Sequence, residues 1–181
     1  LSVPGFAINV SALQFKAPEE LEQDIENTLA AAGLTPDLLE IELTETALMQ
    51  TSREHRETLE RLRAKGYRLA IDDFGTGYSS LDYLRRLPVD RIKIDRSFIG
   101  KIASDAGDAT IVKAAINIAQ DFGLTVIAEG VETADQLALL HDWGCREVQG
   151  YYFAKPMPAA EVAKLLRQGV IRPEEELVAA K

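Results

Sequence analysis

The chain has 181 residues, of which 46% are hydrophobic and 27% charged, a composition typical of a globular domain with its own core. Its formal net charge of −9 argues against DNA as a partner, because a polyanion would meet a repulsive average field. The single cysteine, Cys145, excludes a disulfide framework and a cysteine-based zinc site, and no apolar run reaches the roughly 18 residues of a membrane span. These features favour a cytoplasmic domain, either free or on the cytoplasmic side of a membrane-anchored parent protein.

Apolar segments of strand length alternate with segments of helical period along the whole chain. The expected strands, in chain order, are 6–10, 39–43, 68–71, 91–94, 125–128 and 147–149. The helices expected between and after them are 18–32, 52–65, 80–87, 109–122, 133–142 and 159–167. Alternation of this kind predicts an α/β fold with a parallel sheet.

No break in composition divides the chain, so we expect one domain over residues 1–170 and a charged tail over 171–181. The first residue is Leu1 rather than methionine, and it stands just before an expected strand. We therefore expect the chain to be a piece of a longer protein.

Polar residues stand at or just past the end of each expected strand. They are Asn9, Glu42, Asp72, Asp73, Lys93, Asp95, Glu129 and Gln149. For each residue taken alone, a structural role such as helix capping or solvent exposure is as good an explanation as a role in a functional site. In a (β/α)₈ barrel, however, the carboxyl ends of all strands converge on one mouth, so residues distant in sequence would meet there.

An asparagine and several carboxylates, without clustered histidine or cysteine, form an oxygen-rich ligand set that suits Mg²⁺ or Mn²⁺. The neighbouring Asp72 and Asp73 could hold two ions, a common device for cleaving phosphodiesters. Lys93 could orient or deprotonate water, hold a phosphate oxygen, or form a plain ion pair.

Six motifs occur in the order and spacing of the EAL-domain phosphodiesterases, which this chain resembles over about residues 6–168. They are Asn9-Val10-Ser11, Glu42-Leu43-Thr44-Glu45, the run from Asp72 to Ser80, Lys93-Ile94-Asp95, Glu129-Gly130-Val131-Glu132 and Gln149-Gly150-Tyr151. The resemblance implies a modified (β/α)₈ barrel of the TIM type, with about six βα units in this chain. It also implies hydrolysis of cyclic di-GMP to linear pGpG with two Mg²⁺ or Mn²⁺ ions.

The resemblance also assigns roles. Asn9, Glu42 and Asp72 are expected to hold one metal, with Asp72 bridging to a second metal that Asp73 helps to hold. Glu129 is expected at the metal and water site, Lys93 as the residue that activates water, and Gln149 and Asp95 as supporting residues. Glu45 and Glu132 are expected to fix the loop 74–80, which in the family couples homodimer contacts to metal binding.

The Glu-Ala-Leu tripeptide that names the family is absent, and its strand would precede Leu1. Its glutamate is a metal ligand in the family. We therefore expect this chain alone to be inactive, and the full-length protein to add the missing strands and upstream sensory or cyclase-like domains.

Other classes of protein share some of these features. A protein kinase shares the tripeptide Asp73-Phe74-Gly75, but the chain has no glycine-rich phosphate loop upstream of it. A magnesium enzyme that stabilises an enolate on the same kind of barrel is allowed by residue positions alone. The strongest alternative is an inactive EAL-like receptor or scaffold that binds cyclic di-GMP without cleaving it.

Overall fold

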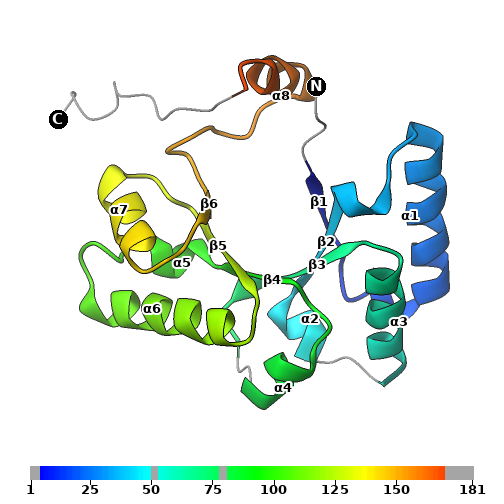
Figure 1. The fold of residues 1–181 in the computed structure, drawn as a ribbon, viewed down its shortest axis with the longest axis horizontal. Helices are drawn as coiled ribbons and strands as arrows, with labels where there is room; N and C mark the ends of the chain where they lie inside the picture. The colour runs from blue at the N-terminus through cyan, green and yellow to red at the C-terminus, as the bar shows by residue number, and fades with distance from the viewer. Residues whose placement is uncertain (1–4, 50–52, 78–80, 170–181) are drawn as a thin grey trace.

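The computed structural model describes residues 5–49, 53–77 and 81–169. In these ranges six strands form one parallel sheet in sequence order: β1 (Phe6–Asn9), β2 (Leu39–Thr44), β3 (Arg68–Phe74), β4 (Arg91–Ile94), β5 (Thr125–Glu129) and β6 (Glu147–Gln149). The sheet curls into an arc with helices along its convex side (Figure 1). The predicted α/β fold is confirmed, and the six strands make up part of a TIM-type barrel.

The helices of the described residues are α1 (Pro18–Ala32), α2 (Glu45–Met49), α3 (Arg53–Ala64), α4 (Leu81–Arg86), α5 (Arg96–Ile99), α6 (Ala106–Asp121), α7 (Ala134–Asp142) and α8 (Ala159–Arg167). Two 3₁₀ helices, Gln14–Lys16 and Pro36–Leu38, precede α1 and β2. The short helices α2 and α5 were not predicted, because so few residues show no repeat of apolar positions. The starts predicted at 52 and 80, and the tail 171–181, lie outside the described residues.

Local sequence signals account for where the long helices begin and end. Pro18 opens α1 at a position where its missing N–H costs nothing, and Gly33 ends the helix in the left-handed conformation, with φ 66°. Thr133 and Gln136 form a reciprocal capping box at the start of α7. The predicted boundaries of these two helices are therefore confirmed.

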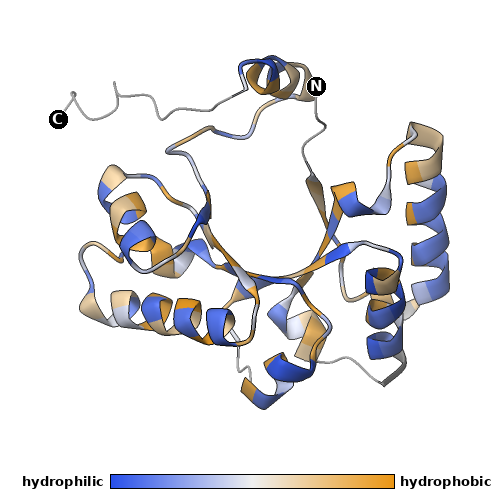
Figure 2. Cartoon of the chain, viewed as in Figure 1, coloured by the Kyte–Doolittle hydropathy of each residue, from blue (hydrophilic) through white to orange (hydrophobic). Residues whose placement is uncertain are grey.

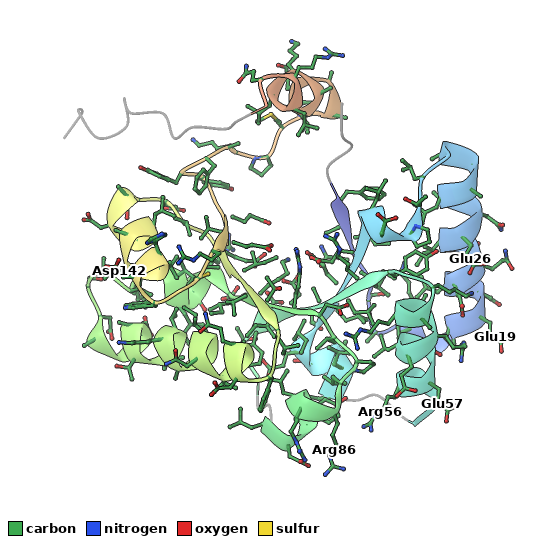
Figure 3. The ribbon with its side chains drawn as sticks, in the orientation of Figure 1. Glu19, Glu26, Arg56, Glu57, Arg86 and Asp142 are labelled. Atoms are coloured by element: carbon green, nitrogen blue, oxygen red, sulfur yellow. The ribbon has the colours of Figure 1, made fainter. Side chains whose placement is uncertain are left out.

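The two faces of the sheet differ in chemistry. Alternate strand residues face the helices and are almost fully buried, among them Ile41, Leu43, Leu69, Ile71, Ile92, Ile94, Val126 and Ala128. Burying each large aliphatic side chain stabilises the fold by about 1.5–3 kcal/mol. The helices turn apolar sides toward the sheet (Figure 2), whereas labelled charged side chains such as Glu19 and Glu57 extend outward (Figure 3). The concave face therefore carries the remaining polar strand residues.

The strand β3 is longer than predicted. It was expected to end at Ile71, with Asp72 and Asp73 in the turn that follows, but pairing continues to Phe74. The register with β4 shifts between Ile71 and Phe74, which marks a bulge. The two aspartates therefore lie within the strand, and the expectation that they follow it was wrong.

Candidate metal centre

The centre of the concave face is Lys93, on β4. Its Nζ atom lies 2.8 Å from a carboxylate oxygen of each of three acids, which come from β2, β3 and β5: Glu42, Asp72 and Glu129. The Lys93 side chain is only 6% exposed, and those of the three acids are 8%, 13% and 17% exposed. The curvature of the sheet thus brings four of the predicted site residues into direct contact.

The electrostatics of this cluster are dominated by the acids. Burial by itself would lower the pKa of Lys93, but the hydrogen bonds that its ammonium donates to the three carboxylates outweigh burial and raise the pKa well above its usual value. Burial raises the pKa of Glu129, against the opposing effect of the Lys93 ammonium. Lys93 is therefore a cation that partly neutralises an otherwise acidic cluster.

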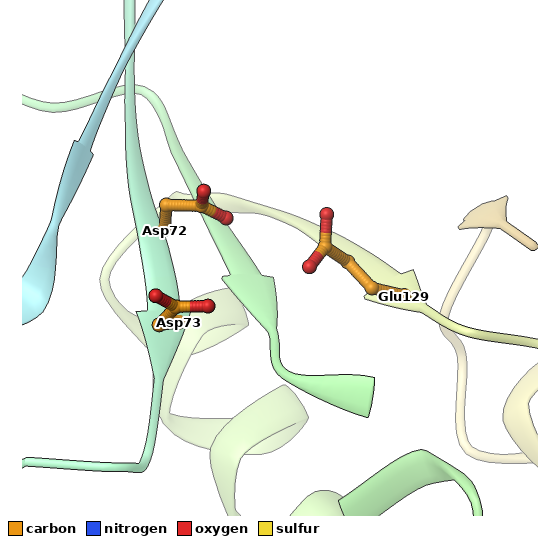
Figure 4. Close-up of side chains that lie close together, drawn as sticks. All are labelled: Asp72, Asp73 and Glu129. Atoms are coloured by element: carbon orange, nitrogen blue, oxygen red, sulfur yellow. The ribbon is translucent and has the colours of Figure 1, made fainter. Parts of the chain in front are cut away.

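The bulge in β3 explains how two adjacent residues can serve one site. Successive residues of a regular strand point to opposite faces. Asp73 instead has φ 54°, in the left-handed region, and its carboxylate lies on the same side as that of Asp72 (Figure 4). Burial, followed by the charges of Asp72 and Asp95, raises the pKa of Asp73.

The acids Asp72, Asp73 and Glu129 form a candidate metal site. One ligand oxygen from each lies within 4.8 Å of those of the other two. Carboxylate oxygens at this spacing, together with Glu42, suit a hard divalent cation such as Mg²⁺ or Mn²⁺. The residues present therefore fit the metal that the sequence predicts.

The conformation of Asp73 has a cost that can be measured. A left-handed backbone costs a residue with a Cβ atom roughly 1–2 kcal/mol, and glycine avoids this cost. We expect Asp73→Gly to raise the melting temperature of the metal-free protein, and Asp73→Ala to leave it lower than Asp73→Gly. Both variants should lose metal affinity. Equal melting temperatures for the two variants, measured by differential scanning calorimetry, would contradict the strain.

The predicted ligands and supporting residues at the strand ends are less tightly tied together. Asn9 is exposed and lies opposite Glu42 in the register of β1 and β2, and Gln149 is exposed and lies opposite Glu129. Neither side chain forms a hydrogen bond with another described residue. Both side chains therefore stand beside the cluster, at strand ends from which they could reach an ion or ligand bound there.

The three predicted loop and supporting acids have different surroundings. Glu45 is 3% exposed, and its Oε2 accepts a hydrogen bond of 2.9 Å from the backbone N–H of Gly75. A Cβ at Gly77 would lie 2.8 Å from Glu45 Oε1, so the described part of the loop packs closely on this carboxylate. Glu132 forms no such bond with residues 74–77. Asp95 caps α5 through a 2.9 Å bond from the Ser97 N–H.

A cavity of about 530 Å³ opens beside the cluster. Glu129, Glu132 and Gln149 line it on the sheet side, and the cations Arg96 and Lys155 line it as well. Sequence reasoning missed both cations. Arg96 belongs to the unpredicted helix α5, and Lys155 follows β6 in a segment without secondary structure, so neither fell at an expected strand end.

Comparison with known proteins agrees with this geometry. The family model described as "EAL domain" matches residues 2–156. The cyclic di-GMP phosphodiesterase NbdA of Pseudomonas aeruginosa is 50% identical over 147 residues, which cover 81% of this chain and 19% of NbdA. The chain spans about a fifth of the length of the curated relatives it matches.

Solved structures are similar over most of the chain. A structure of the MucR phosphodiesterase of Pseudomonas aeruginosa with cyclic di-GMP has a TM-score of 0.82 and 44% identity, and the match covers 87% of this chain and 64% of that one. A Klebsiella pneumoniae BlrP1 complex with manganese and cyclic di-GMP has a TM-score of 0.79 and 37% identity, with coverage of 86% and 40%.

Proposed function

Because the chain belongs to the EAL domain family, we propose that its site takes part in the metal-dependent hydrolysis of cyclic di-GMP to linear pGpG. The observation that carries this proposal is the contact of Lys93 with three carboxylates, two of which also belong to the candidate metal site. The cyclic di-GMP complexes of related structures support the choice of substrate.

The ligand assignment uses the residues that the fold brings together. Asn9, Glu42 and Asp72 would hold one divalent ion, Asp72 and Asp73 a second, and Glu129 stands at the same edge of the sheet. Two such ions would polarise the phosphate and supply an activated water. The manganese complex of BlrP1 supports divalent metal binding, and the donor set suits Mg²⁺ as well as Mn²⁺.

The protein's own residues would orient the substrate. The ammonium of Lys93 is a donor at the centre of the acids, where it can hold a phosphate oxygen or the attacking water. Arg96 and Lys155 place positive charge along the neighbouring cavity, where the phosphates of an anionic ligand can lie close to them.

Partners and location are also part of the proposal. The longer relatives support regulatory domains outside this segment. The loop that Glu45 holds through Gly75 would link the site to a homodimer interface. In the described residues, no helix is long and apolar enough to cross a bilayer. A cytoplasmic location is supported by Cys145, which is buried and unpaired.

Metal substitution tests the proposed function. In the full-length protein we expect Mg²⁺ and Mn²⁺ to support cleavage of cyclic di-GMP and Ca²⁺ to bind without turnover, because Ca²⁺ takes longer bonds and a looser geometry. Product formation is measured by chromatography after removal of metal with EDTA and replacement by each ion. Equal rates with Ca²⁺ would contradict the two-metal mechanism, and binding without cleavage under Mn²⁺ would favour the receptor function.

A further inference from the structure

A second group of charged residues lies on the concave face, two residues before the site residues along the strands. It shares no residue with the Lys93 cluster. Arg91 precedes Lys93 by two positions on β4, so both side chains leave the same face of the strand. Its Nε lies 3.2 Å from Glu40 Oε2, on β2. Its two terminal nitrogens lie 3.1 and 3.3 Å from the two carboxylate oxygens of Glu147, on β6.

These contacts join strands that do not touch one another. In the sheet, β4 is hydrogen-bonded to β3 and β5, whereas β2 and β6 each lie one strand further away. Arg91 therefore spans the concave face, with a hydrogen-bonded ion pair to Glu147 on β6 and an ion pair to Glu40 on β2 in which Glu40 Oε2 accepts no hydrogen bond. The residue beside it on β3 is Ala70, fully buried and small enough to leave a path to Glu40.

The strands that Arg91 joins also carry the site. Glu42 follows Glu40 by two residues on β2, and Gln149 follows Glu147 by two residues on β6. Strand residues two apart share a face, so a shift of Glu40 or Glu147 moves the site residue above it. The side chain of Glu40 is 10% exposed, and that of Arg91 is 20% exposed, so water screens this pair less than a surface pair.

We propose that Arg91 is a positioning residue for the metal centre, which sets the distance of β2 and β6 from β4 through Glu40 and Glu147. The proposal rests on the metal-dependent function proposed above. Arg91 touches neither the substrate nor the metal. It acts through Glu42 on one side and through the end of β6 on the other. Residues that contact the ligands of a metal, but not the metal itself, orient those ligands in the same way.

The alternative is that Arg91 only neutralises two acids. Loss of the arginine alone would then destabilise the protein, because Glu40 would be left as a buried charge without a partner. Removing all three charges together would repair that defect. The two roles differ in one respect. The triple variant contains no unpaired buried charge, but it also lacks the bridge between the strands.

The test compares Arg91→Met, Arg91→Lys and the triple variant Glu40→Gln/Arg91→Met/Glu147→Gln in the full-length protein. We expect Arg91→Met to weaken Mn²⁺ binding, measured by isothermal titration calorimetry, by about 10–100-fold, the range found for outer residues of metal sites. Arg91→Lys should recover part of the affinity. The triple variant should regain the melting temperature but not the affinity. In Arg91→Met and in the triple variant, kcat should fall with little change in KM.

Arg85→Met is the matched control, because Arg85 is an exposed helix residue paired with Asp82, and we expect it to bind Mn²⁺ like the unmodified protein. Unchanged affinity in Arg91→Met, or full recovery of affinity in the triple variant, overturns the positioning role and leaves the proposed function intact. Absence of Mn²⁺ binding and of cyclic di-GMP cleavage in the unmodified protein overturns both.

Discussion

Replacing Asp72 by asparagine should nearly abolish cleavage of cyclic di-GMP while leaving the fold in place. The change keeps the shape of the side chain and removes its charge. One carboxylate oxygen of Asp72 lies 2.8 Å from Lys93 Nζ, and a ligand oxygen of Asp72 lies within 4.8 Å of ligand oxygens of Asp73 and Glu129. We expect the loss of activity to exceed the roughly 10–100-fold typical of an outer residue of a metal site. Steady-state kinetics and Mn²⁺ titration measure the two consequences.

Two variants frame this prediction. Asp24→Asn makes the same chemical change on an exposed position of α1, and it should leave activity and metal binding unchanged. Glu132→Gln changes an acid of the cavity wall outside the metal cluster, and it should cost less activity than Asp72→Asn. If Asp72→Asn bound Mn²⁺ as well as the unmodified protein, the metal would have to be placed elsewhere.

Replacing Lys93 by methionine should lower kcat by about 10²–10³-fold, the range found when a donor that stabilises charge in the transition state is lost. Methionine preserves most of the length of the side chain but none of its donors. Because three carboxylates would lose their shared cation, the metal-free protein should be less stable by roughly 3–5 kcal/mol, as for a broken buried ion pair. Saturating Mn²⁺ should restore much of that stability.

The kinetic readout separates two roles for Lys93. A fall in kcat at constant KM, in protein kept folded by Mn²⁺, agrees with a role in the chemical step. A rise in KM alone would make Lys93 a phosphate-binding residue instead. Urea titrations with and without Mn²⁺ distinguish either kinetic effect from simple unfolding.

Much of the fold could be predicted from the sequence because its signals are local. Apolar runs mark the strands and long helices, together with residues such as Gly33, which ends a helix, and Thr133, which begins one. The parallel sheet follows from their alternation. The bulge in β3 could not be predicted, because it depends on the pairing of β3 with β4, in which Asp72 and Asp73 have no partner. The short helix that begins at Arg96 was missed because its few residues carry no periodic pattern.

The candidate site could be predicted as a set of positions but not as a set of contacts. Polar residues at strand ends are visible in the sequence, whereas the meeting of Lys93 with three acids depends on the curvature of the sheet. The pair Glu40 and Arg91 was overlooked, although each stands two residues before a predicted site residue. The two-residue repeat of a strand contains that signal, since both positions of each pair share a face.

The contrast between the two faces of the sheet also restricts how the strands can pair. A slip of one residue would turn Lys93 and Glu42 toward the helices and leave Ile92 and Ile41 on the polar side. Each mispaired strand would lose apolar packing and bury a charge at the same time. The acids of the concave face thus penalise incorrect register during folding, in addition to any part they play in binding metal.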